Sequence, residues 1–189
     1  MKKGDGGFWL YVRIALLNLA VVGMFISVSQ TPPSPTVFRP FILTTQTKPI
    51  IAGVPTRIII SSLGMDLNVG TGSYDSNTNS WTIDDTKAYF ADVSVPLNNR
   101  GGTTVIYGHN QESVFGSLHN IQPNAEGIIY SDNDYIFHYV YQSMRQVLPN
   151  DTTIFQDSGK PVLVLLTCSG GWDTYRSLYT FKLETVDKS

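Results

Sequence analysis

Residues 162–176, VLVLLTCSGGWDTYR, decide how this chain is interpreted. The first five residues are apolar on both faces of an extended chain, which is typical of a central, buried strand. Cys168 follows at the end of this predicted strand, and a Gly-rich loop follows Cys168. Loops at strand ends are where a rigid scaffold presents reactive groups. Cys168 is therefore a candidate nucleophile, and the alternative is a buried, inert thiol.

Cys168 is the single cysteine of the 189 residues, so it cannot form an intramolecular disulfide or a zinc site of the usual pattern. Nucleophilic chemistry also needs a base and a group that stabilises the oxyanion. His109 is the preferred base because it follows a predicted strand, 103–107, at a sharp turn. The other histidines are His119, in a predicted short helix, and His138, in the middle of a predicted strand.

Arg176 is the candidate third member of the site. If 162–167 and 178–185 pair as a hairpin, Cys168 and Arg176 flank the connecting loop. A guanidinium at that place could bind a substrate carbonyl or the oxyanion with its fork of donors. The alternative is a surface arginine in a salt bridge.

Beyond this stretch, the chain from Ile50 onward is a succession of short β-type runs. Turn-rich segments separate them, and one pair, around Ser-Asp-Asn-Asp, has the pattern of a hairpin. The predicted strands are 57–63, 81–83, 103–107, 127–130, 135–141, 162–167 and 178–185. Short helices are predicted at 85–90 and near 111–118. Seven or eight strands within about 135 residues indicate one all-β domain, a closed barrel or a sandwich.

The N-terminal part has a different character. Two lysines precede residues 8–28, which are almost wholly apolar and long enough to cross a bilayer. The positive-inside rule places the N-terminus in the cytoplasm and the rest outside. We predict a cytoplasmic tip and transmembrane signal anchor at 1–30, a Pro-rich stalk at 31–49 and the β-domain at 50–189. A cleaved signal peptide and a disordered tether are the alternatives.

The charge pattern excludes one class of partner. The net charge is −2, and lysine and arginine form no run or stripe. Binding to phosphate backbones needs clustered cations, so nucleic acid is not an expected partner.

In order and spacing, these segments resemble the sortases, cysteine transpeptidases of bacterial cell surfaces. The resemblance runs from about residue 54 to residue 186. Residues 55–64 resemble the family's opening strand, and 101–109 resemble the stretch that leads to its catalytic histidine. Residues 165–168 resemble its cysteine motif, with Arg176 at the place of its catalytic arginine. Departures at Ser61, Ser62 and Asn110 leave the subclass open.

The resemblance implies an eight-stranded β-barrel with short helices and a two-step reaction. The Cys168 thiolate would attack the Thr carbonyl of an LPXTG-like C-terminal signal and form a thioester. His109 would protonate the departing amine and deprotonate the incoming one. Arg176 would stabilise the oxyanion, and Thr167 and Arg176 would bind the signal. The incoming amine would belong to a peptidoglycan precursor or a pilin lysine. The expected active form of Cys168 is a low-pKa thiolate beside cationic groups.

The resemblance implies no cofactor. Some sortases bind calcium, but the acidic residues of this chain are scattered, and we interpret them as a solvated surface: Asp84, Asp85, Glu126, Asp132 and Asp134. With the predicted anchor, the resemblance implies a single-pass membrane protein whose catalytic domain lies on the cell-wall side and acts on secreted surface proteins.

Two other functions stay open. An extracytoplasmic cysteine peptidase would pass the same thioester to water. L,D-transpeptidases are a poorer match, because their motif has glycine directly before the cysteine, where this chain has Thr167. A non-catalytic surface β-domain that binds peptide or glycan would need no reactive thiol, so the substitution Cys168→Ala separates it from an enzyme.

Overall fold

The computed structural model describes residues 49–78, 80–156 and 158–189. The predicted anchor at 1–30 and all but the last residue of the predicted stalk lie outside the described residues, so both stay predictions. Within the described part of the chain, no helix is long and apolar enough to span a bilayer.

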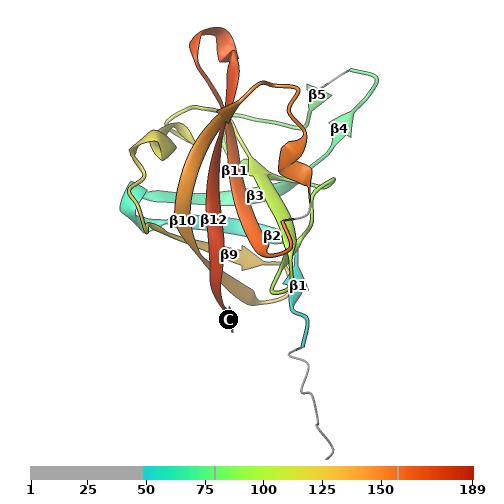
Figure 1. Cartoon of the computed structure of the whole chain (residues 1–189), viewed down its shortest axis with the longest axis vertical. Coiled ribbons are helices and arrows are strands. Elements are labelled where there is room, and N and C mark those ends of the chain that lie inside the picture. The colour runs from blue at the N-terminus through green and yellow to red at the C-terminus, as the bar shows by residue number, and fades with distance from the viewer. Residues whose placement is uncertain (1–48, 79, 157) are drawn as a thin grey trace, which may run out of the picture. The chain divides into compact units, whose positions relative to one another are not determined.

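Eight strands close into a barrel (Figure 1). Around the barrel the order is β10-β12-β11-β8-β6-β3-β2-β9. The strands are β2 (Pro55–Ile60), β3 (Met65–Gly72), β6 (Ala88–Ala91), β8 (Gly102–Tyr107), β9 (Glu126–Ser131), β10 (Tyr135–Val147), β11 (Pro161–Ser169) and β12 (Tyr175–Lys188). The predicted all-β fold is confirmed, and it is the closed barrel, not the sandwich.

Short elements connect these strands. Two small ladders pair β1 (Ala52–Gly53) with β7 (Leu97–Asn98) and β4 (Tyr74–Asp75) with β5 (Ser80–Trp81). The described helical turns are all 3₁₀: η1 (Ser61–Leu63), η2 (Gly116–Asn120), η3 (Thr153–Phe155) and η4 (Gly171–Asp173). The helix predicted near 111–118 is therefore a 3₁₀ turn that begins later.

The predictions around β2 and β6 need correction, and one strand was missed. The strand predicted at 57–63 ends at Ile60, where η1 begins. The helix predicted at 85–90 is wrong, because β6 occupies Ala88–Ala91 and all four of its residues are buried. β6 pairs with β3 on one side and β8 on the other. A short apolar run buried on both faces has no period that separates strand from helix. The strand β3, rich in Asp, Asn and Gly, was not predicted at all.

Apolar side chains form two separate clusters. The first fills the barrel and receives residues from strands all round it: Ile58, Ile60, Phe90, Ile106, Ile129, Phe137, Leu163, Leu165, Tyr179 and Phe181. The second contains Tyr89, Ala91, Val105, Tyr107, Ile154, Val164 and Leu178. Successive residues of a strand point to opposite faces. Because Leu163 and Leu165 lie in the first cluster and Val164 in the second, the second cluster lies on the outer face of the barrel.

The strands β8, β11 and β12 are neighbours, and their pairing positions the site. β11 runs antiparallel to β12, which confirms the hairpin predicted around Cys168, and parallel to β8. The predicted hairpin of β9 and β10 is also confirmed. Figure 1 shows β10, β12 and β11 side by side along the barrel.

Candidate active site

The three predicted catalytic residues occupy adjacent strand ends. Cys168 on β11 and Arg176 on β12 are direct partners in the antiparallel ladder. On the other side of β11, the parallel register ends with Leu166 opposite Tyr107. The backbone N–H of Gly108 donates to the Leu166 carbonyl at 3.1 Å, so the alignment continues beyond β8. Two residues further along each of the two segments, His109 and Cys168 are at the same level.

These positions share the outer face of the barrel. Cys168 lies two residues after Leu166, which packs against the second cluster, and Arg176 lies two residues before Leu178, a member of that cluster. Because side chains alternate along a strand, Cys168 and Arg176 continue the second cluster outward. Cys168 is a free, half-buried thiol. The inert-thiol interpretation requires Cys168 to be sealed inside the barrel. The structure does not place it there.

Thr167 lies on the other face of β11. Its side chain is buried, with 3% exposed, and its hydroxyl donates to the Gly108 carbonyl at 2.9 Å. This bond fixes the residue before Cys168 against the residue before His109. A substrate contact by Thr167 stays a prediction, while the hydrogen bond of its side chain links the two strand ends.

The electrostatic setting of Cys168 differs from the expected one. Burial raises the pKa of the thiol above its usual value, Arg176 lowers it, and Asp173 raises it. Removing the thiolate from water outweighs the nearby guanidinium. The expected lowering of the Cys168 pKa is therefore not found: burial raises it, and the degree of burial was not visible in the sequence.

Arg176 closes the loop between β11 and β12. Its Nη1 donates to the backbone carbonyls of Asp173 at 2.9 Å and Tyr175 at 3.1 Å. The loop is strained, because Trp172 and Asp173 both have left-handed backbone angles, φ 56° and 55°. The observed partners of Arg176 are thus loop carbonyls, and the guanidinium holds the strained turn beside Cys168.

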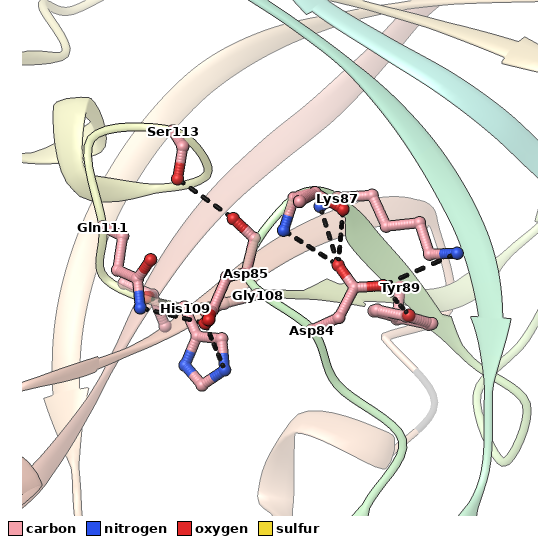
Figure 2. Close-up of polar contacts among 10 residues, drawn as sticks. Asp84, Asp85, Lys87, Tyr89, Gly108, His109, Gln111 and Ser113 are labelled. Carbon is pink, nitrogen blue, oxygen red and sulfur yellow. Dashed lines mark hydrogen bonds and ion pairs between the residues drawn. The ribbon is translucent and has the colours of Figure 1, made fainter.

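His109 is half-exposed, with 34% of its side chain accessible. Its backbone carbonyl accepts a bond from the Phe115 N–H at 3.1 Å, which ties down the loop after β8. Its Nε2 lies 3.6 Å from Asp85 Oδ1 (Figure 2). Sequence analysis missed this neighbour, since Asp85 was interpreted as solvated surface and no motif links it to a histidine so far along the chain.

The other two histidines have structural partners. His138 lies between Glu126, at 2.8 Å, and Asp187, at 3.3 Å, on the outside of β10. His119 Nδ1 contacts the Gly116 carbonyl within its own 3₁₀ turn. Among the residues that the structure describes, no group of three His, Cys, Asp or Glu side chains could hold a metal ion.

Comparisons with known proteins show the family and the fold. The sequence model of the sortase domain matches residues 58–183. The fold is similar to sortase A of Listeria monocytogenes, with a TM-score of 0.59 and 16% identity over 74% of this chain and 92% of that one. It is also similar to sortase C1 of Streptococcus agalactiae, with a TM-score of 0.59 and 20% identity over 70% and 68% of the two chains.

A third similar structure is sortase E1 of Streptomyces coelicolor with a tripeptide in its active site. Its TM-score is 0.57, with 14% identity over 72% of this chain and 91% of that one. No curated protein sequence matches. Identities this low carry the fold alone, but the sequence match covers most of the β-barrel. The chain belongs to the sortase family, whose members are cysteine transpeptidases.

Proposed function

We propose that this chain cleaves an LPXTG-like sorting signal and transfers the cleaved protein to an amine. One observation carries the proposal: the single cysteine, a histidine and an arginine lie at three adjacent strand ends. Cys168 and Arg176 are ladder partners. The Gly108 bonds to Leu166 and Thr167 hold His109 at the level of Cys168.

In the first step, Cys168 Sγ attacks the Thr carbonyl of the signal. A C–S bond forms, the C–N bond breaks, and the amine leaves with a proton from His109. Because burial raises the pKa of the resting thiol, Cys168 loses its proton to His109 before or during the attack. The same imidazolium then supplies the proton that the leaving amine needs.

Arg176 stabilises the oxyanion of this step. A guanidinium has five N–H donors in a fixed fork, and the two loop bonds engage only Nη1. Further donors are left for a substrate carbonyl, and the loop bonds hold the fork in place before substrate arrives. Fixed donors of this kind are more effective than donors that must reorganise during the reaction.

In the second step, an amine attacks the thioester. A C–N bond forms, the C–S bond breaks, Cys168 leaves as the thiolate, and His109 takes the proton of the amine and returns it to the thiolate. We propose an amine of a peptidoglycan precursor or a pilin lysine as the acceptor and a secreted surface protein as the donor. The predicted anchor at 1–30 and stalk at 31–49 would hold the catalytic domain at 50–189 outside the cell membrane, where both substrates occur.

The test is intact mass of the full chain in detergent micelles after incubation with a panel of LPXTG-type peptides. Wild type and Cys168→Ala are compared, with and without glycine amines. A mass gain that matches the peptide up to its Thr, absent in Cys168→Ala and discharged by amine into a ligated product, supports a transpeptidase. Hydrolysed product alone supports a cysteine peptidase. No adduct with any peptide refutes the proposal and favours a binding domain.

A further inference from the structure

The segment before β6 is fixed by the carboxylate of Asp84 (Figure 2). Asp84 Oδ1 accepts from the N–H and hydroxyl of Thr86, at 2.8 and 2.9 Å, and from the Lys87 N–H at 3.2 Å. Asp84 Oδ2 accepts from the Tyr89 hydroxyl at 2.6 Å. These hydrogen bonds hold the pKa of Asp84 far below its usual range, and the bond from Tyr89 has the largest effect. The turn is therefore tightly defined although it lies at the surface.

Through Tyr89, this turn is tied to the strand that leads to His109. Tyr89 on β6 pairs with Tyr107 on β8, and their rings stack with centroids 5.9 Å apart. His109 follows Tyr107 by two residues. The position of the turn relative to His109 is thus set by strand pairing and ring stacking together.

Asp85, next in the turn, reaches the loop of His109 at three points. Its Oδ1 lies 3.6 Å from His109 Nε2 and accepts a bond from Gln111 Nε2 at 3.1 Å. Its backbone carbonyl accepts from the Ser113 hydroxyl at 3.1 Å. Asp84 therefore shapes the turn, and the turn directs the Asp85 carboxylate toward the imidazole. Figure 2 shows the two carboxylates on opposite sides of the turn.

We propose that Asp85 is a positioning residue for His109. Its carboxylate orients the imidazole through Nε2 and stabilises the positive charge that forms when Cys168 gives up its proton. Asp85 acts on the substrate only through His109. The inference rests on the proposed function, because it assigns His109 the proton-transfer role. Asp85 is the charged group in contact with His109, at 3.6 Å, while Cys168 and Arg176 occupy the neighbouring strand ends.

The opposing interpretation is an idle surface pair. The side chain of Asp85 is 72% exposed, and exposed ion pairs contribute little to stability. A positioning role predicts that loss of the Asp85 charge lowers kcat, whereas an idle pair predicts no change. Kinetic measurements on variants of equal stability therefore separate the two.

The kinetic test uses the full chain in micelles with three variants. Asp85→Asn keeps the shape and removes the charge, Asp85→Glu keeps the charge, and Asp92→Asn removes an exposed charge from the loop after β6. We expect Asp85→Asn to lower kcat about three-fold with KM for the peptide unchanged, the size of one exposed charge pair. Asp85→Glu should recover part of the loss, and Asp92→Asn should behave as wild type.

A second measurement does not depend on activity. The ring ¹⁵N signals of the three histidines are recorded at one pH in the Cys168→Ala background, with His109 assigned by His109→Gln. Asp85→Asn should move the His109 signals, and Asp92→Asn should not. If no peptide reacts with wild type, the proposed function fails, while these spectra still decide the contact. Unmoved His109 signals, or an Asp85→Asn enzyme with wild-type kcat, would overturn the inference.

Discussion

The two faces of β11 differ in what they do for the molecule. The inner face carries Leu163 and Leu165, both 0% exposed and packed with residues of strands all round the barrel. The outer face carries Val164, which belongs to the second cluster, Leu166, which packs against it, and then the half-buried Cys168. One face of the strand thus packs the barrel interior, and the other carries the free, half-buried thiol. The comparison shows that Cys168 is accessible because the outer face of β11 is only partly covered by other side chains.

The sharpest test of this difference removes one leucine from each face. We expect Leu165→Ala to lower the free energy of unfolding by about 2–5 kcal/mol, because it leaves a cavity inside the barrel. Leu166→Ala, on the half-buried outer face, should cost about 1 kcal/mol, because its surroundings include solvent. Urea unfolding followed by tryptophan fluorescence measures both, and equal losses would remove the distinction between the faces.

The second test crowds the outer cluster. A Cβ at Gly72 would overlap the Tyr107 hydroxyl and touch its ring, with Tyr89 close by. Gly72→Ala should therefore cost about 1–3 kcal/mol through overpacking. The control is Gly171→Ala, since nothing lies within 4 Å of a Cβ at that position. A Gly72→Ala protein as stable as wild type would mean that the side chains of the outer cluster rearrange at little cost in free energy.

The third test concerns the thiol. Burial raises the pKa of Cys168, so the rate of alkylation by iodoacetamide should rise with pH and reach its midpoint above the usual thiol value. Arg176 lowers this pKa and Asp173 raises it. Arg176→Gln should therefore slow alkylation at neutral pH, and Asp173→Asn should speed it, each by up to about ten-fold per unit of pKa.

The chain offers good controls for this measurement. Cys168 is the only thiol, so intact mass reports it without ambiguity. Asparagine tolerates the left-handed angle of Asp173, and Arg176→Lys retains the charge. Alkylation that is fast at neutral pH in wild type would contradict a raised pKa.

The smallest expected effect is the loss of one hydrogen bond. The Tyr107 hydroxyl donates to the Thr82 carbonyl at 2.6 Å and so ties the outer cluster to the loop before β6. Tyr107→Phe should cost about 1 kcal/mol, the usual net contribution of one such bond. The urea experiment serves again, and a loss as large as that of Leu165→Ala would show that the outer face carries as much stability as the interior.

Local patterns predicted the parts of the fold that hold the candidate site. The apolar run of β11, the alternation in β12 and the turn residues around His109 are each visible within a few residues. They predicted the strand ends and the three candidate residues that the structure brings together. The prediction of β6 failed because its two buried faces depend on β3 and β8, which are distant in sequence.

The site features that sequence analysis missed are all non-local. The contact of Asp85 with His109 depends on the pairing of β6 with β8, and neither residue indicates it alone. The raised pKa of Cys168 depends on how much of the thiol is buried, which the packing of the outer cluster decides. The candidate residues could be predicted from their order in the sequence. Their neighbours and the pKa of Cys168 could be determined only from the folded barrel.

The parallel pairing of β8 with β11 has a consequence for the order in which the chain folds. Cys168 and Arg176 meet within one hairpin, which is a local and fast event. His109 joins them only when a parallel pair closes, and its Gly108–Thr167 bond spans 59 residues. Non-local parallel pairing is slow, because the entropy of loop closure is lost before the contacts are gained. We therefore expect Cys168 and Arg176 to pair before His109 joins them, so the candidate site is complete only when the barrel closes.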